Sequence, residues 1–546
     1  FLLFIFENNF KYLKMRRYYI LFVIISFGFT FANVSCNSKK ENSSEVVAEE
    51  QLENVVHYSN IPIDSSAISS FYKTYPELKK YQKETISLYQ KHNYNQIWYD
   101  KKGIVEFGHS LYAKYSTIEK EGLKVVFPYQ NRLEGIFNDD VENTLNQETT
   151  ELMITNLYFF YADKVYNGLD SKISTEMGWL LPRKQISYVS LLDSVMQNSK
   201  SSLDDSKVLI GQYYKLREVF VKYREIEKNG GWNSIDLDPN LKSYKPGDSA
   251  KAIGQIRERL FVTGDIKDNN KSAIYDQELV EAVNHYQLRN GFKSDNLIFP
   301  KHIKQMNQPI GERIKQIMVN MERCRWISPE ITNAYEYILV NIPSYNLTFI
   351  RDGKVALKSP VVVGKTMNKT VIFSGKMSYI VFSPYWNIPT SIIRKEVKPG
   401  MAKNKNYLAQ HNMEWNNGNV RQKPGKNNSL GLVKFIFPNS NNIYLHDTPS
   451  KSLFENETRA YSHGCVRVGK ARDLAITILK EDKNWTPAKI DAAMNAGKEN
   501  AYVLKNKIPV YIGYFTAWVN EEGELNFFQD IYDRDDRLAK LIYSEN

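Results

Sequence analysis

Residues 462–468 read Ser462-His463-Gly464-Cys465-Val466-Arg467-Val468, the only stretch where the chain sets a cysteine beside a histidine and a glycine. A thiol has an ordinary pKa of about 8.5, so it is mostly protonated at neutral pH and needs a base to become a nucleophile. Histidine can be that base, and Gly464 lets the backbone pass close to a bound carbonyl. The backbone N–H groups of 463–465 could stabilise an oxyanion. The stretch therefore predicts acyl transfer with Cys465 as the nucleophile.

A second histidine, His446, lies nineteen residues before Cys465, in the stretch 443–449 (Ile-Tyr-Leu-His-Asp-Thr-Pro). We expect His446 to be the general base, with its tautomer fixed by a neighbouring carbonyl or by Asp447, and to lower the pKa of the thiol. His463 precedes Cys465 by two residues, so in an extended segment both side chains share a face. That placement predicts an accessory role for His463.

Three other interpretations of these residues remain open. A lone cysteine or histidine usually packs in a core rather than performing chemistry. Outside the cytoplasm Cys465 could also form a disulfide. A metal site is disfavoured, because two histidines and one cysteine without CxxC or HxxxH spacing are not typical of zinc binding. We therefore expect neither a metal nor a cofactor.

A histidine, fifteen residues (447–461) and then Ser-His-Gly-Cys together resemble the signature of the L,D-transpeptidases with a YkuD-type catalytic domain. The resemblance spans residues 309–515 and implies an enzyme of the bacterial envelope that acts on peptidoglycan. It implies that Cys465 attacks a tetrapeptide stem, releases the terminal D-Ala and forms a thioester. The amine of a second stem's diamino acid then resolves this thioester as a 3→3 cross-link. Carbapenems are expected to acylate the same thiol.

Two alternative functions follow from the same residues. An L,D-carboxypeptidase, or another cysteine hydrolase, would use the same thiol with water in place of the amine. A wall-binding lipoprotein with a decayed catalytic domain would need no chemistry, but intact Cys465, His446 and His463 argue against it.

Four further residues are predicted to contact the substrate. Tyr444 stands two residues before His446, so it shares a strand face with that base. Arg467 stands two residues after Cys465; it is a candidate partner for a stem carboxylate, with a structural salt bridge as the alternative. Ser462, beside the turn, and Trp386, in the family-like stretch 384–389 (Pro-Tyr-Trp-Asn-Ile-Pro), complete the set.

The N-terminal region resembles a bacterial lipoprotein signal. The chain begins with Phe1, and Met15 is the expected start, followed by two arginines, an apolar run over 18–31 and Ser35-Cys36. We expect residues 1–36 to be a signal peptide with Cys36 as the lipidated residue. An uncleaved anchor is the alternative, although the run is short of the ~20 residues that span a bilayer. This predicts a periplasmic, membrane-anchored protein.

Composition sets the remaining limits. A chain of 546 residues is too long for a single core, so we expect three or more domains. Its net charge of +11 suits an anionic wall or membrane, but no nucleic-acid motif or basic helix is present, so no nucleic-acid partner is expected. The three cysteines, Cys36, Cys324 and Cys465, do not form a disulfide scaffold, and Cys324 is predicted to be buried packing.

The fold class predicted from this pattern is a multidomain α+β protein. A polar tether (37–56) precedes a helical region (57–229) in which Met153, Leu157, Phe160 and Tyr161 recur at helical spacing until Gly168. This region resembles the scaffold domain of the larger L,D-transpeptidases. Three short amphipathic segments in 239–308 resemble a peptidoglycan-binding module, with a purely architectural role as the alternative.

The segment 309–515 predicts a β-sandwich or barrel-like catalytic domain, with Asp352-Gly353 as a tight hairpin turn. Regular periodicity fails between 392 and 432, so we expect a long loop there. In the family this region resembles a capping insertion over the site; a mobile surface insertion is the alternative. Residues 516–546 form a C-terminal extension.

Overall fold

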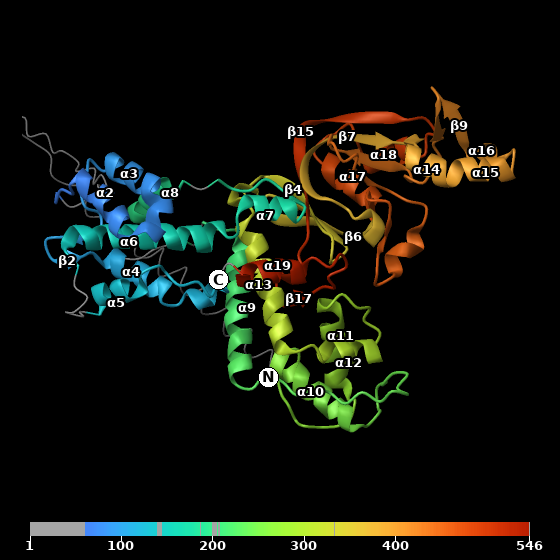
Figure 1. The fold of residues 1–546 in the computed structure, drawn as a ribbon. Helices are drawn as coiled ribbons and strands as arrows, with labels where there is room; N and C mark the ends of the chain where they lie inside the picture. The colour runs from blue at the N-terminus through green and yellow to red at the C-terminus, as the bar shows by residue number, and fades with distance from the viewer. Residues whose placement is uncertain are drawn as a thin grey trace, which may run out of the picture. The chain divides into compact units, whose positions relative to one another are not determined.

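The computed structural model describes residues 60–138, 145–185, 187–198, 205, 208–331 and 333–544 (Figure 1). The predicted signal peptide with Cys36 and the whole of the predicted tether, 37–56, lie outside these residues. No helix within the described ranges has both the length and the apolar character needed to cross a membrane.

The N-terminal region is built from short helices around one apolar helix, α6 (Gln147–Tyr161), whose middle and end are buried on all sides. The residues predicted at helical spacing, Met153, Leu157, Phe160 and Tyr161, are at most 4% exposed. Their helix continues as η4 (Ala162–Asn167) and ends at Gly168, which has φ +70°, so the predicted end is confirmed. The other elements are α2 (Ser65–Thr74), η1 (Pro76–Tyr81), α3 (Gln82–Lys91), β1 (Tyr99–Asp100), β2 (Gly103–Ile104), α4 (Glu106–Tyr115), η2 (Ile118–Glu121), α5 (Gln130–Phe137), α7 (Ser171–Glu176), β3 (Trp179–Leu180), α8 (Tyr188–Asn198) and α9 (Gly211–Lys228).

One buried carboxylate connects α6 to the chain before it. Glu151 accepts the backbone N–H groups of Ile97 at 2.6 Å and Trp98 at 3.0 Å, and the hydroxyl of Tyr89 at 2.8 Å. Burial raises the pKa of Glu151 to about 7, although these donors act against the rise. The carboxylate thus satisfies backbone donors that would otherwise be unpaired in the core.

A separate small core forms inside residues 239–308. The three predicted helices are α10 (Lys251–Thr263), α11 (Gln277–Arg289) and α12 (Pro300–Met306). Ile253, Ile256, Leu279 and Val283 form its centre with Ile303, and all are at most 1% exposed. The helical spacing seen in the sequence is therefore confirmed, while wall binding by this module stays a prediction.

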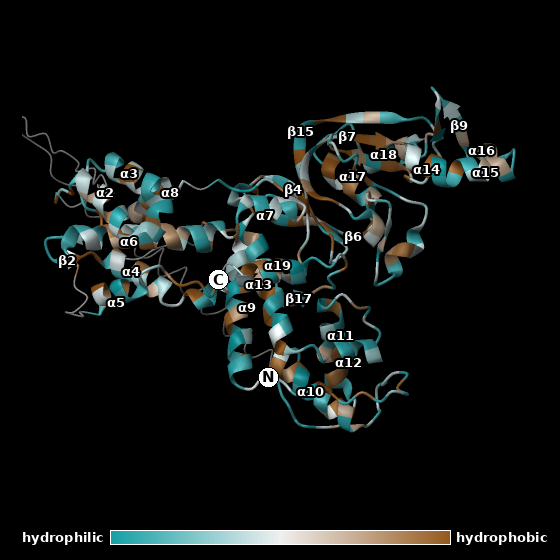
Figure 2. Cartoon of the chain, in the orientation of Figure 1, coloured by the Kyte–Doolittle hydropathy of each residue, from teal (hydrophilic) through white to brown (hydrophobic). Residues whose placement is uncertain are grey.

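The C-terminal region holds a sheet that closes on itself. Its strand order is β11-β12-β14-β6-β5-β4-β15-β7, and β11 also pairs with β7, which completes a barrel-like ring. Figure 2 shows hydrophobic residues along β7 and the strands beside it. The predicted α+β class is thus observed. The strands and covering helices are β4 (Glu336–Asn341), β5 (Asn346–Arg351), β6 (Lys354–Gly364), β7 (Ile372–Phe382), β11 (Val433–Ile436), β12 (Leu445–His446), β13 (Ala460–Ser462), β14 (Val466–Val468), β15 (Asn500–Gly513), α17 (Ala471–Leu479) and α18 (Pro487–Met494).

The segment expected to be a long loop is folded instead. Ile388, Ile393, Val397 and Val420 form its own small core, each at most 7% exposed. Its elements contain two to six residues, too few to show a period in the sequence, which is why the loop prediction was wrong. They are β8 (Trp386–Asn387), α14 (Thr390–Ile392), η7 (Ile393–Val397), α15 (Lys398–Lys403), α16 (Tyr407–Gln410), β9 (Met413–Asn416) and β10 (Asn419–Gln422), with strand order β8-β10-β9.

The C-terminal extension is packed into the molecule rather than trailing from it. Its elements are β16 (Ala517–Val519), β17 (Leu525–Phe527) and α19 (Asp535–Ser544). Asp535 pairs with Arg323 of α13 (Ile310–Arg325) at 2.8 Å. Cys324 on the same helix is completely buried, so its predicted packing role is confirmed.

Candidate active site

The turn that carries Cys465 is a bend between two short strands. β13 ends at Ser462 and β14 begins at Val466, and Gly464 between them has φ +120°, a conformation that L side chains rarely adopt. The expectation that His463 and Cys465 share a face of an extended segment is therefore wrong. A glycine is needed here because the chain must reverse direction within three residues.

Hydrogen bonds inside the turn fix its shape. The Ser462 hydroxyl donates to the carbonyl of Cys465 at 2.5 Å and accepts the N–H of Gly464 at 3.1 Å. Ser462 is 2% exposed, so these contacts give it a positioning role, and direct contact with substrate stays a prediction. The N–H of Gly464 is thereby used. Within the described part of the chain no hydrogen-bond partner is found for the N–H groups of His463 and Cys465, so their role as oxyanion donors stays a prediction.

A residue that the sequence did not indicate also supports the turn. The hydroxyl of Thr370 donates to the carbonyl of Gly464 at 2.9 Å and accepts the N–H of Gly364 at 2.8 Å. Tyr532, from the C-terminal extension, accepts the N–H of Thr370 at 3.1 Å and donates to the carbonyl of Gly364 at 2.5 Å. The sequence could not indicate this network, because its residues are far apart in the chain and belong to no recognisable motif.

Strand register places four predicted residues on one face. β12 and β14 are parallel, with Leu445 opposite Val466 and His446 opposite Arg467. Leu445 and Val466 are completely buried, so the residues that alternate with them face the other way. That face carries His446 of β12 and Arg467 of β14, and Tyr444 and Cys465, which immediately precede the two strands, interact with each other beside it. Tyr444 stands beside Cys465, and His446 stands beside Arg467.

The thiol of Cys465 is partly buried and lies 3.7 Å from the carbonyl of Asn442. Burial raises its pKa, while hydrogen bonds from the backbone and hydroxyl of Tyr444 and the charge of Arg467 lower it. The first effect dominates, so the resting thiol is protonated at neutral pH. The Tyr444 hydroxyl is the side-chain donor that stabilises a thiolate when one forms.

His446 is 5% exposed, and its Nδ1–H donates to the backbone carbonyl of Asp447 at 2.5 Å. The carbonyl, and not the Asp447 carboxylate, therefore orients the ring, leaving Nε2 as the basic nitrogen. Burial lowers the pKa of His446 to about 4, partly offset by the carbonyls of Asp447 and Leu430. No hydrogen bond between His446 and Cys465 is found among the described contacts. The expected lowering of the thiol pKa by His446 is not observed, because burial keeps both groups neutral.

An aromatic residue on β8, just before the segment 392–432, lies at the site. Trp386 on β8 lies near the hydroxyl of Tyr444 and acts to lower its pKa, and the same hydroxyl interacts with Cys465. The rings of Tyr444 and His446 lie 5.7 Å apart at 61°. Trp386 and Tyr444, both predicted from the sequence, thus form one wall beside the thiol.

Arg467 carries a positive charge without a carboxylate partner among the described residues, and its Nε is buried without a hydrogen-bond partner. Burial lowers its pKa, and the neighbouring Cys465 acts in the opposite direction. The alternative of a structural salt bridge finds no support here, so the guanidinium is available to a substrate carboxylate.

His463 points away from the four-residue face toward the insertion. Its side chain is 48% exposed, and its Nε2 lies 3.8 Å from Oε1 of Glu396 in η7. The described residues contain no group of three or more His, Cys, Asp or Glu side chains able to hold a metal. The chemistry available is therefore that of a thiol, two imidazoles, a phenol and backbone donors.

Comparisons with known proteins match two parts of the chain to known domain families. Residues 335–490 match the family model of the YkuD L,D-transpeptidase catalytic domain, and residues 83–219 match the Scaffold domain. A Haemophilus influenzae protein named provisionally as an L,D-transpeptidase is 36% identical over 250 residues. The match covers 42% of this chain and 50% of that protein, so the chain spans about half the length of this curated relative.

Solved structures of the same name are more distant. An L,D-transpeptidase from Mycobacterium smegmatis is 12% identical, with a TM-score of 0.20, and the match covers 33% of this chain and 59% of that one. L,D-transpeptidase 3 from Mycobacterium tuberculosis, solved with a faropenem-derived adduct, is 14% identical with a TM-score of 0.18, over 33% of this chain and 60% of that one. Scores of this size do not establish a common fold for whole chains.

Proposed function

Because residues 335–490 form an L,D-transpeptidase catalytic domain and residues 83–219 a Scaffold domain, we propose that this protein forms 3→3 cross-links between peptidoglycan stem peptides. The observation that carries the proposal is the shared face of β12 and β14. It sets a nucleophile, a phenol donor, a buried imidazole and an unpaired guanidinium side by side. Each has a role in acyl transfer to a charged peptide.

In the acylation half-reaction, the sulfur of Cys465 bonds to the carbonyl carbon between the third stem residue and the terminal D-Ala. His446 takes the thiol proton, since its imidazole is neutral at pH 7. The carbonyl electrons move to oxygen, where the N–H groups of 463 and 465 stabilise the oxyanion. When the tetrahedral intermediate collapses, the C–N bond breaks, and the proton held by His446 passes to the departing amine.

In the second half-reaction, the side-chain amine of an acceptor stem attacks the thioester. Its nitrogen bonds to the carbonyl carbon, and its proton passes to His446. As the C–S bond breaks, His446 returns that proton to the sulfur, which restores the thiol. Arg467 binds a carboxylate of the stem, and Trp386 with Tyr444 forms the wall that keeps water from the thioester. Because the resting pair is neutral, proton transfer accompanies attack rather than preceding it.

Incubation of the purified protein with disaccharide-tetrapeptide, followed by mass analysis of the products, tests the proposal. A cross-linked dimer with loss of one D-Ala is expected. A disaccharide-tripeptide with no dimer would identify an L,D-carboxypeptidase or another cysteine hydrolase, and unchanged substrate would leave only a wall-binding role. The Cys465→Ala variant is the matched control, and it should release no D-Ala.

We also propose that the protein is held at the envelope membrane through lipid on Cys36, as Ser35-Cys36 after an apolar run suggests. The Cys36→Ser variant should leave the membrane fraction or accumulate as an uncleaved precursor. The proposal fails if wild type and variant fractionate alike and both begin at Asn37.

A further inference from the structure

Three arginines surround a small cavity far along the chain from the catalytic turn. Arg259 comes from α10, Arg289 from α11 and Arg313 from α13. All three line a cavity of about 20 Å³, and its lining residues include no aspartate or glutamate. Three cations from three different helices therefore lie around one cavity, where they repel one another.

Only one of these charges is neutralised. Arg289 pairs with Asp265, whose side chain is completely buried, and this pairing holds the pKa of Asp265 down at about 2. Arg259 is 3% exposed, and its Nε and Nη1 have no hydrogen-bond partner. Within the described residues, neither Arg259 nor Arg313 has a carboxylate at ion-pair distance. A buried, unpaired cation is costly, so the arrangement calls for a counter-charge.

Aromatic rings hold the two unpaired guanidiniums in place. Arg259 lies over Trp232 at 4.5 Å from the ring centroid, and Arg313 lies over Phe527 at 4.4 Å. Arg313 also donates to the side chain of Gln316 at 3.1 Å. Stacking fixes the planes.

Arg259 donates from Nη2 to the carbonyl of Asn233 at 2.6 Å, and Arg313 donates from Nη2 to the carbonyl of Gln305 at 3.2 Å. The Nε and Nη1 of Arg259 are the nitrogens left without a partner, so they are the ones an anion can bind. Burial lowers the pKa of Arg259 to about 10, so the group is still charged at neutral pH.

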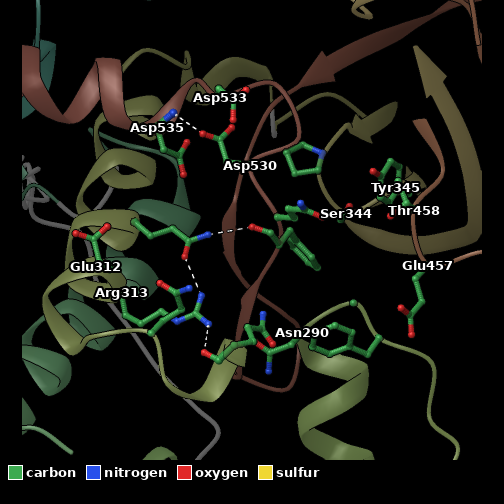
Figure 3. Close-up of a pocket in the computed structure, with 18 of the residues that line it drawn as sticks. Asn290, Glu312, Arg313, Ser344, Tyr345, Glu457, Thr458, Asp530, Asp533 and Asp535 are labelled. Carbon is green, nitrogen blue, oxygen red and sulfur yellow. Dashed lines mark hydrogen bonds between the residues drawn. The ribbon is translucent and has the colours of Figure 1, made fainter. Parts of the chain in front are cut away.

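The cavity opens beside a larger space. Arg313 and Asn290 also line a neighbouring cavity of about 480 Å³, where Figure 3 shows them on one wall. Asn290 has a buried side-chain oxygen without a partner, so amide as well as guanidinium groups border the small cavity. Arg313 and Asn290 therefore separate the small cavity from the larger one.

We propose that Arg259 and Arg313, with Arg289 behind them, bind a single halide ion in this cavity. A volume of about 20 Å³ holds roughly one water-sized particle, whereas phosphate or a carboxylate brings several heavy atoms. The ion neutralises two cations contributed by different elements, and so it fastens the three-helix module to α13 and to the β16–β17 hairpin that carries Phe527.

The first test uses bromide, which has the charge of chloride and scatters anomalously. Crystals of the protein grown with sodium bromide should show an anomalous peak between Arg259 and Arg313. In solution, the thermal unfolding midpoint should be about 2–4 °C higher in sodium chloride than in sodium gluconate of equal ionic strength. No peak at this place, together with equal midpoints in the two salts, overturns the proposal.

Variants separate a bound ion from aromatic stacking alone. Arg259→Met keeps the apolar stem and removes the charge, so it should abolish the bromide peak and the salt difference. In gluconate it should be at least as stable as wild type, because an unpaired charge is gone. Arg224→Met, on exposed α9, is the control and should keep both effects. If acetate or phosphate occupies the cavity and bromide does not, the halide assignment is overturned. If Arg259→Met does not fold, the bromide peak in crystals of the wild-type protein alone decides whether the ion binds.

Discussion

The protonation state of the catalytic face follows from burial at single residues. Cys465 and His446 each lose solvent, and burial disfavours the charged form of both. A thiolate–imidazolium pair is therefore absent at rest, and the Tyr444 hydroxyl, with its own pKa raised by burial and by the neighbouring thiol, stays protonated as a donor. The Cys465 thiol is therefore protonated at rest, and it loses its proton to His446 only when it attacks a bound carbonyl.

Replacing Cys465 by alanine tests the nucleophile. A carbapenem should leave a covalent adduct on the wild-type protein, because the strained ring is an acyl donor for a thiol with oxyanion donors at hand. The Cys465→Ala variant should give no adduct while its circular dichroism stays native. Cys324→Ser is the control, since that thiol is completely buried and should not contribute. An adduct of unchanged yield on Cys465→Ala would refute the assignment.

Removing the base should separate acylation from thiol ionisation. We expect His446→Ala to slow carbapenem acylation about 10²–10⁴-fold, the usual loss for a general base. The alkylation rate of Cys465 should rise with pH to a midpoint above the ordinary ~8.5, since burial raises the thiol pKa. His446→Ala should move that midpoint little, and Tyr444→Phe should move it further upward by removing a donor.

The pH profile of alkylation decides between two electrostatic schemes. A wild-type midpoint below 7 that rises in His446→Ala would mean a resting ion pair, against the neutral pair inferred here. A profile moved by His463→Ala and untouched by the His446 and Tyr444 variants would reverse the two histidines. Iodoacetamide is the suitable reagent because it needs no oxyanion stabilisation.

Helices and strands long enough to show a repeating hydrophobic pattern could be predicted from the sequence. Bends and elements of only a few residues could not. Asp352-Gly353, both at positive φ, joins β5 to β6 as the two-residue turn that the sequence indicated. The sequence predicts an extended segment at 463–465, where the structure has a bend, because a single glycine at φ +120° leaves no periodic pattern. The sequence likewise predicts a loop for 392–432, because core residues such as Val420 come from segments too short to alternate.

The contact between His463 and Glu396 predicts that replacing Glu396 changes the rate of carbapenem acylation little, and that replacing His463 changes it more. The His463–Glu396 pair is about half exposed on both sides, so it should contribute about 0–1 kcal/mol. Glu396→Gln should therefore change carbapenem acylation less than about fivefold. His463→Ala should slow it more if the imidazole also contacts substrate. Equal small effects of both variants, measured by stopped-flow fluorescence, would reduce His463 to a contact with the insertion.

For the whole molecule, parts far apart in sequence converge on the catalytic turn. The sequence predicts no role for the C-terminal extension, yet Tyr532 is 1% exposed and its hydroxyl bonds to Thr370 and to Gly364. Likewise β3, from the helical region, adds to the edge of β7 in the barrel sheet. Such couplings depend on three-dimensional packing and leave no local pattern, which is why sequence reasoning found the site residues but not their supports.

Replacing Tyr532 by phenylalanine should therefore act on the active site through Thr370. The loss of one hydroxyl leaves the buried N–H of Thr370 and the carbonyl of Gly364 without partners, a cost of about 1–3 kcal/mol. Because Thr370 holds the carbonyl of Gly464, the oxyanion donors should shift, and carbapenem acylation should fall by about tenfold. Iodoacetamide alkylation, which needs no oxyanion donors, should change far less. Tyr543→Phe, an exposed site on α19, is the matched control. If Tyr532→Phe lowers the unfolding midpoint but acylates at the wild-type rate, the network supports only the fold, and the turn is positioned by Ser462 alone.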